Sequence, residues 1–234
     1  MSGSAHAGFR ERRPPVTASG RNALHRARRP PAGPGLGASV ARRFAREGFR
    51  VALVAQRKDR LDALVEQLTA EGMETAGFTA DLSRPTEVPA LTEAIRDRFG
   101  RIDVIEYSPI SGEQGFSPAT KLDAATLEKD SPLLLTPVEV VRAVLPEWTE
   151  RGDGAFLMTT GHTAVQPRPY MSGVGTLMSA ARNWLCSLNG ELAQIGAYAG
   201  TLSIEALIAG SEMVGPLVDP DDLARALLGH VHQP

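Results

Sequence analysis

The spacing of apolar residues changes in a regular order along this chain from residue 33 onward. Short apolar runs such as Val51-Ala52-Leu53-Val54 indicate buried strands, and they alternate with segments whose apolar residues recur every three to four positions, as in amphipathic helices. Glycines follow several of the helical segments, and glycine commonly ends a helix. The pattern predicts strands at 50–55, 74–80, 102–107, 155–160 and 197–204, and helices at 36–47, 59–71, 85–99, 123–150, 175–194 and 219–231.

Strands that alternate with helices indicate a parallel sheet covered by helices on both faces. The sequence therefore predicts a single α/β domain over residues 31–234, a Rossmann-type doubly wound parallel sheet. Such a sheet needs a buried first strand before the first helix, and that place holds HRARRPP at residues 25–31. Because proline removes a ladder donor and unpaired buried charge is costly, we expect the first strand to be missing or degenerate.

The first 30 residues differ in composition from the rest of the chain. They hold seven arginines and one acid, Glu11, so their net charge of +6 leaves −8 on residues 31–234. Basic segments bind nucleic acid or act as transit peptides, but Pro14-Pro15 and Pro30-Pro31 would interrupt an amphipathic helix. We expect residues 1–30 to be a disordered tail foreign to the fold, with no nucleic-acid partner. A transit-like tail and the product of a frameshift or a wrong start stay open as alternatives.

The overall composition narrows the class of protein. Hydrophobic residues make up 42% and charged residues 22% of the chain, as in globular proteins. No apolar run approaches the ~18 residues of a membrane-spanning helix. The single cysteine, Cys186, excludes an internal disulfide, and no Cys/His cluster has the spacing of metal ligands. We therefore expect a cytoplasmic protein with no metal site and no membrane contact.

A glycine-rich run opens the first predicted helix, and Gly33, Gly35, Leu36 and Gly37 are its candidate cofactor-binding residues. Glycine lets the backbone approach a pyrophosphate, and a helix N-terminus presents free N–H groups to it. About 20 residues later, where an acid would hold the 2′-hydroxyl of NAD, the chain has Arg57. A cation there suits the 2′-phosphate, so NADP is expected rather than NAD. The alternative for Arg57 is a solvated charge at the start of a helix.

These residues resemble the short-chain dehydrogenase/reductase family. The family's loop is similar to Gly-x-x-x-Gly-x-Gly; Gly35 and Gly37 match its last two glycines, whereas Pro31 stands in place of the first. Asp81 and Leu82, after the third strand, match the family's adenine-contacting acid. The resemblance runs from residue 31 to about residue 231. It implies NAD(P) binding, hydride transfer to or from a small carbonyl or alcohol, and a homo-oligomer formed through the helices at 123–150 and 175–194.

The resemblance also implies a proton-transfer set that this chain does not match. In the family a tyrosine exchanges a proton with the substrate oxygen, a lysine four residues later lowers its pKa, and a serine about thirteen residues upstream holds the oxygen. Thr160 falls at the serine position, but Gly173 and Leu177 stand where tyrosine and lysine are expected. The position of a fourth member, an asparagine, falls near Leu133.

The sequence offers few substitutes for these groups. A frame slid by one residue gives Val174 and Met178, which is no better. Tyr170 lies three residues before the expected tyrosine, and His162 follows the strand that ends at Thr160, where it is either a titrating group near the site or a surface histidine. No lysine lies nearby, and an unassisted phenol of pKa about 10 is a poor base at neutral pH. Thr160 and Tyr170 are thus the candidate catalytic residues.

The carboxyl end of the predicted strand at 102–107 also departs from the family pattern. Where the family has Asn-Asn-Ala-Gly, this chain has Glu106-Tyr107-Ser108-Pro109. Ligands bind at such strand ends in open α/β sheets, which makes Tyr107 and Ser108 further candidates. Three interpretations stay open: a divergent NADP-dependent oxidoreductase, a non-catalytic nucleotide-binding or dimer-forming relative, and a defective gene product with an incomplete fold.

Overall fold

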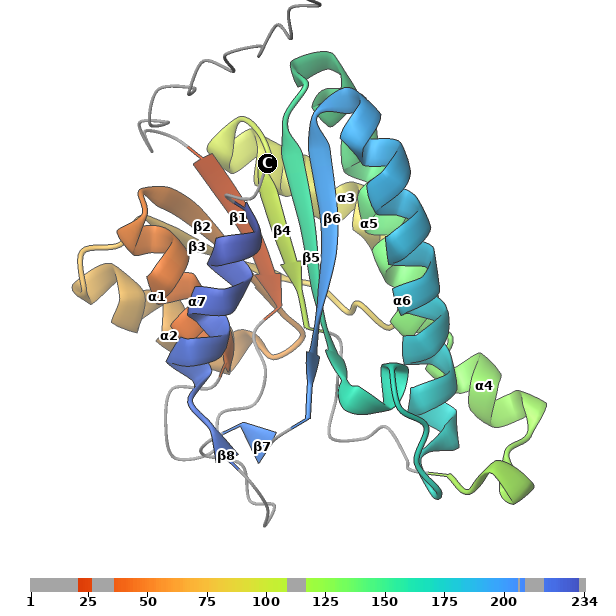
Figure 1. The fold of residues 1–234 in the computed structure, drawn as a ribbon. Coiled ribbons are helices and arrows are strands. Elements are labelled where there is room, and N and C mark those ends of the chain that lie inside the picture. Colours follow the sequence, from red (N-terminus) through yellow and green to blue (C-terminus); the bar gives the residue numbers. More distant parts are fainter. Residues whose placement is uncertain (1–20, 27–35, 109–116, 206, 209–216, 232–234) are drawn as a thin grey trace, which may run out of the picture.

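The computed structural model of this chain describes residues 21–26, 36–108, 117–205, 207–208 and 217–231. Six parallel strands form one sheet in the order β3-β2-β1-β4-β5-β6 (Figure 1). The chain builds outward from β1 on one side and then crosses back to build outward from β4 on the other, which is the predicted doubly wound arrangement. The strands are β1 (Arg21–Arg26), β2 (Phe49–Ala55), β3 (Thr75–Thr79), β4 (Val104–Tyr107), β5 (Gly154–Gly161) and β6 (Ala197–Ile204).

Helices cover both faces of this sheet, as the sequence predicted. They are α1 (Leu36–Arg46), α2 (Lys58–Ala70), α3 (Val88–Phe99), α4 (Ala124–Asp130), α5 (Pro132–Arg151), α6 (Ser172–Leu192) and α7 (Pro220–Val231). α1, α2 and α7 lie on one face, and α3, α5 and α6 lie on the other (Figure 1). The helix at 123–150, expected to be interrupted by Pro132 and Pro137, is divided only at the first of them. Pro132 occupies the first turn of α5, where a missing N–H costs nothing, whereas α5 continues through Pro137.

Two short elements were not predicted. β7 (Leu207–Ile208) and β8 (Leu217–Val218) pair with each other in a separate two-stranded sheet. Strands of two residues are too short to show an alternation of apolar and polar positions, so the sequence pattern carried no signal for them.

The central strand is present. It begins at Arg21, a few residues before the segment 25–31 in which a first strand was expected. β1 pairs in parallel with β2 over six residues and with β4 over three. Its sequence, RNALHR, begins and ends with arginine, so the strand is degenerate rather than missing. Ladder hydrogen bonds come from the backbone and not from apolar side chains, and the prolines that would interrupt them come after Arg26. These six residues of the segment 1–30 therefore belong to the sheet; residues 1–20 and 27–30 lie outside the described part.

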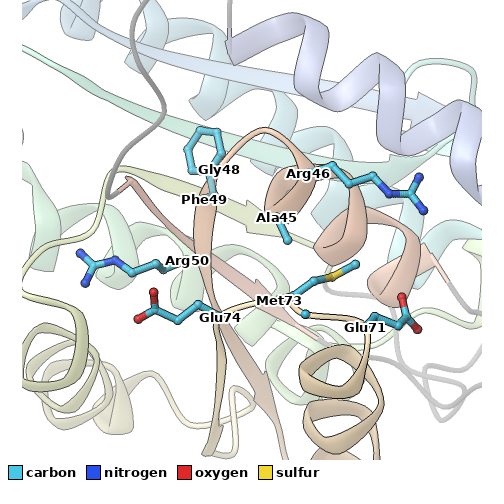
Figure 2. A pocket seen from close by; sticks show the side chains of 9 residues that line it. Ala45, Arg46, Gly48, Phe49, Arg50, Glu71, Met73 and Glu74 are labelled. Carbon is cyan, nitrogen blue, oxygen red and sulfur yellow. The ribbon is translucent and has the colours of Figure 1, made fainter.

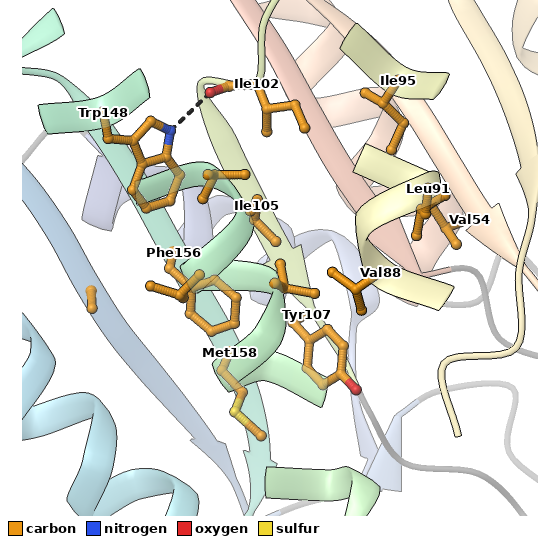
Figure 3. Packing of buried hydrophobic residues seen from close by; sticks show 14 of the residues in the cluster. Val54, Val88, Leu91, Ile95, Ile102, Ile105, Tyr107, Trp148, Phe156 and Met158 are labelled. Atoms are coloured by element: carbon orange, nitrogen blue, oxygen red, sulfur yellow. Dashed lines mark hydrogen bonds between the residues drawn. The ribbon is translucent and has the colours of Figure 1, made fainter. Parts of the chain in front are cut away.

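The core fixes the strands against the helices. On one face Trp148 is fully buried and donates its Nε1–H to the carbonyl of Ile102 at 2.8 Å, while the Tyr107 ring stacks on Phe156 with centroids 6.2 Å apart (Figure 3). The opposite face carries a cluster that joins α1 and α7 to β4 and β5. Both faces of β4 are therefore buried, which holds its carboxyl end in place.

Candidate functional site

The carboxyl ends of the parallel strands form the edge at which sheets of this kind bind ligands. α1 begins at that edge, directly after the glycine-rich run, and its first residues Leu36 and Gly37 are buried. The N–H groups of its first turn have no partner within the helix and are suited to a pyrophosphate. Gly33 and Gly35 lie outside the described residues, so the structure does not describe their half of the predicted cradle.

Arg57 follows β2 at this same edge, with its side chain about half exposed. Its Nη2 donates to Oδ2 of Asp59 at 3.2 Å, and this hydrogen bond is the main reason that the pKa of Asp59 lies below its ordinary value. Solvent screens an exposed pair of this kind, so it contributes little to stability and does not hold Arg57 firmly.

Asp81 and Leu82 follow β3 in a turn that is held by several hydrogen bonds. Oδ1 of Asp81 accepts from the backbone N–H of Ser83 at 3.0 Å and from its hydroxyl at 2.7 Å. Leu82 is buried, and its carbonyl accepts from the hydroxyl of Thr136 at 2.7 Å. Both residues lie at the carboxyl edge, beside the strand end that carries Arg57. Their contact with an adenine stays a prediction.

The two candidate catalytic residues lie in different surroundings. Thr160 is fully buried near the end of β5, and its hydroxyl shares a hydrogen bond of 3.0 Å with the hydroxyl of Ser203 on β6. Tyr170 is 69% exposed, in the connection between β5 and α6. Its φ of 68° is the only positive φ among the described residues other than glycine. The burial of Thr160 and the exposure of Tyr170 give no sign of a shared site.

Leu133 and Leu177, two of the positions at which the resemblance places the proton-transfer residues, belong to an apolar cluster that also contains Val174 and Met178 from the frame slid by one residue. We call it the Leu133 cluster; it consists of Leu133, Ala164, Val174 and Met178, with Leu177 packed against them. Gly173 is also buried. The sulfur of Met178 accepts a hydrogen bond from the backbone N–H of Gly161 at 3.2 Å. None of these described side chains can take up or give off a proton at neutral pH.

A chain of three buried polar side chains lies at the carboxyl ends of β4 and β5. Glu106, Ser108 and Thr159 are 1%, 6% and 3% exposed. The Ser108 hydroxyl donates to the Glu106 carboxylate, and the Thr159 hydroxyl donates to Oγ of Ser108 at 2.6 Å. The sequence singled out Tyr107 together with Ser108, but Tyr107 points to the other face of the sheet and belongs to the core. Glu106 was missed; a carboxylate inside an apolar strand was the available signal.

Charged contacts tie the segment that carries Tyr170 to the end of β6. Nη2 of Arg168 lies 3.1 Å from Oε1 of Glu205. Nε2 of His162 lies 3.8 Å from the same oxygen and 3.0 Å from Oε1 of Gln166. His162 thus faces polar partners at the rim of the ligand edge. These contacts hold the connection between β5 and α6 near that edge.

The groove shown in Figure 2 lies at the opposite end of the sheet. It has a volume of about 620 Å³ and is formed by the start of β2, the end of α1 and the turn before β3. None of the predicted site residues lines it. Within the described ranges, no group of three His, Cys, Asp or Glu side chains could hold a metal ion, and no helix is long and apolar enough to cross a membrane.

Comparisons with known proteins agree with this geometry. The family model for short chain dehydrogenases matches residues 31–203. The glucose 1-dehydrogenase of Gluconobacter oxydans is 27% identical over 200 residues, which cover 84% of this chain and 74% of the relative. A short chain dehydrogenase of Pseudocercospora fijiensis is 27% identical over 72% of this chain and 55% of the relative. A fatty acyl-CoA reductase of Mycobacterium tuberculosis is 29% identical over 53% of this chain and 42% of the relative. The matches thus span about half the length of the last two relatives.

Solved structures share the fold over nearly the whole chain. The alcohol dehydrogenase from the archaeon Thermococcus sibiricus, complexed with 5-hydroxy-NADP, matches with a TM-score of 0.76 and 25% identity over 92% of this chain and 91% of that one. The actinorhodin polyketide ketoreductase with NADPH matches with a TM-score of 0.79 and 21% identity over the same shares of the two chains. Because the family model covers well over half of the sequence and the sheet order agrees with it, this chain belongs to the short-chain dehydrogenase/reductase family.

Proposed function

We propose that this chain is an NADP(H)-binding member of the family that does not carry out the family's tyrosine–lysine proton transfer. The Leu133 cluster is the observation that carries this proposal, because packed apolar side chains fill the positions of the expected relay. General acid–base catalysis contributes about 10²–10⁴-fold to such a reaction. A site that lacks the donor loses that contribution even when the dinucleotide is bound.

The proposed preference for NADP over NAD rests on residues at the carboxyl edge of the sheet. Gly33, Gly35, Leu36 and Gly37 would cradle the pyrophosphate at the start of α1, and Asp81 with Leu82 would contact the adenine. Arg57 would pair with the 2′-phosphate, which NAD lacks. NADP or NADPH is bound in several of the family structures with the same fold. A chain with a single cysteine has no internal disulfide to keep oxidised, which suits the reducing cytoplasm that we propose as its location.

A binding experiment tests this proposal. Thermal shift with NADPH should raise the melting temperature through ligand linkage, and NADH should raise it less. Arg57→Gln should remove most of the preference for NADPH, whereas Arg142→Gln should leave it intact, because Arg142 is an exposed, ion-paired arginine on α5. No oxidation of bound NADPH is expected with a panel of aldehydes and ketones. Steady turnover with any of them would contradict the proposal.

A second candidate function, hydride transfer with unfamiliar proton donors, is favoured by the backbone of Tyr170. A left-handed conformation is costly for a tyrosine, and such residues gather at functional sites. In this case Tyr170 would exchange the proton with a small carbonyl or alcohol. Turnover that is abolished in Tyr170→Phe and kept in Tyr198→Phe would support it.

We further propose a homo-oligomer formed through the helices at 123–150 and 175–194, which correspond to α4, α5 and α6. Leu135 on α5 is a large apolar side chain that is about half exposed. Light scattering should show a dimer or a larger assembly, and Leu135→Asp should shift it toward the monomer. A monomer in the unmodified chain would remove this proposal.

A further inference from the structure

The Glu106–Ser108–Thr159 chain is directional. A hydroxyl has one proton to donate and two lone pairs to accept with, whereas a carboxylate only accepts. Ser108 gives its proton to Glu106, and Thr159 gives its proton to Ser108. Both protons therefore point inward, toward the buried carboxylate. One lone pair of Ser108 and both lone pairs of Thr159 are left, and all of them are acceptors.

The chain lies toward the carboxyl edge of the sheet, on the face that α1 covers. On the α1 face of the sheet, Val104 and Leu157 pack in one cluster with Leu36, the first residue of α1. Ser108 and Thr159 are on this same face, closer to the carboxyl edge. They belong to the half of the sheet formed by β4, β5 and β6, which in a doubly wound fold faces the second nucleotide of a dinucleotide.

We infer that Ser108 and Thr159 form an acceptor site for a hydrogen-bond donor on the nicotinamide half of the dinucleotide, with Glu106 as the residue that positions their protons. This inference rests on the proposed function, since it concerns the same bound dinucleotide. Two groups of that half carry suitable protons: the carboxamide N–H₂ and the ribose hydroxyls. A hydroxyl pair with free protons would stabilise an oxyanion, whereas this pair repels one and selects a donor.

Dissociation constants for three ligands test the inference. NADPH carries both donor groups. Its 3-acetylpyridine analogue has a methyl ketone in place of the carboxamide and keeps the ribose. 2′-Phospho-ADP-ribose keeps the ribose and lacks the nicotinamide ring. Each ligand is titrated against the unmodified chain and its variants by fluorescence or calorimetry. For each variant, the change in dissociation constant is compared between the three ligands, because a general loss of structure would not single out one of them.

Thr159→Val is the primary variant, because it removes the hydroxyl and keeps the volume. We expect it to weaken NADPH binding about 3- to 10-fold, the range for one lost hydrogen bond. Thr159→Ser keeps the hydroxyl and should bind as the unmodified chain does. Glu106→Gln should weaken NADPH binding similarly, because an amide can donate as well as accept and no longer fixes the two protons. Thr201→Val, on the adjacent strand β6 and outside the polar chain, is the matched control and should have no effect on binding.

The pattern across ligands identifies the donor. If Thr159→Val weakens NADPH and leaves the acetylpyridine analogue unchanged, the donor is the carboxamide. If it weakens all three ligands equally while Thr159→Ser binds normally, the donor is a ribose hydroxyl. Unchanged affinities for all three ligands in Thr159→Val overturn the inference and leave the proposed function standing. An unmodified chain that binds none of them overturns the proposed function, and the inference fails with it.

Discussion

A lysine at Met178, the lysine position in the frame slid by one residue, tests how firmly the Leu133 cluster is packed. Met178 is 1% exposed and contacts the buried residues of the cluster, so Met178→Lys would put an ammonium group among apolar side chains. Leu177, one residue earlier, is the position at which the resemblance places the lysine, and it serves as the comparison. It packs at the edge of the cluster and is only partly buried, so a lysine there can extend its ammonium group to water.

The expected cost at Met178 has two parts. Burial of a methionine side chain contributes about 1.5–3 kcal/mol, which a lysine stem recovers only in part. An unpaired buried charge costs several kcal/mol more after relaxation. The sum, about 4 kcal/mol or more, is a large fraction of the ~5–15 kcal/mol that stabilises a typical domain. Leu177→Lys should cost about 1 kcal/mol, within the range of a partly exposed substitution.

Urea unfolding followed by circular dichroism measures both values. Met178→Lys should shift the midpoint strongly or abolish the cooperative transition, whereas Leu177→Lys should stay close to the unmodified chain. Met178→Leu serves as the volume-conserving control and should cost less than about 1.5 kcal/mol. Equal midpoints for the two lysine variants would show that the cluster is open to water. The reasoning that the Leu133 cluster is closed to proton transfer would then be refuted.

Three further predictions concern single contacts. The Thr201 hydroxyl is buried without a hydrogen-bond partner in the described structure, which costs free energy of folding. Thr201→Val replaces it with an apolar group of the same shape and should raise the melting temperature. A lower melting temperature would contradict this. Gly154→Ala should lower the free energy of unfolding by about 1–3 kcal/mol, because the added methyl group would overlap the indole ring of Trp148; an unchanged urea midpoint would show that the ring can move. The guanidinium of Arg42, 2.7 Å from both carboxylate oxygens of Glu71, lowers the pKa of that carboxyl. A carboxyl whose pKa is lowered in the folded state stabilises the fold at pH values above its unfolded pKa, and this contribution is lost as the pH falls through the folded pKa. The difference in unfolding free energy between the unmodified chain and Glu71→Gln should therefore shrink from pH 7 to pH 3. A difference independent of pH would exclude the ion pair as its source.

Most of the fold was predictable because its signals are local. The helix at 36–47 and the strand at 50–55 were placed to within a residue or so of α1 and β2, since apolar periodicity and terminal glycines mark such elements directly. β1 was not predicted, because its sequence has no run or alternation of apolar residues that would indicate a strand. It is a strand by its backbone pairing with β2 and β4. Such pairing between distant segments becomes visible only once the sheet is assembled.

The candidate site was predictable in part, and for a related reason. The sequence assigned Leu36, Gly37 and Arg57 to the carboxyl edge of the sheet, where the structure has them, because a loop that follows a strand in a parallel sheet falls at a known end. Their binding to a dinucleotide and the positions assigned to the relay stay predictions. It did not foresee that the side chains at those positions pack together as one cluster, nor that Glu106 meets Thr159 through Ser108. These contacts join residues that lie up to 53 positions apart, from Glu106 to Thr159.

The degenerate central strand and the dinucleotide site are energetically connected. β1 joins the two halves of the sheet, and the glycine-rich run that follows it leads into α1. A ligand that binds only when this strand is paired stabilises the paired state by RT ln(1 + [L]/Kd), about 2.7 kcal/mol at a hundredfold excess over Kd. The sequence of this strand, RNALHR, has only Ala23 and Leu24 as apolar residues. Under the proposed function, the dinucleotide would therefore contribute a larger share of the stability here than in a relative with an apolar first strand. If the dinucleotide binds as proposed, its contribution to stability would be a structural role that does not depend on turnover, so a chain could keep the cradle after losing the relay.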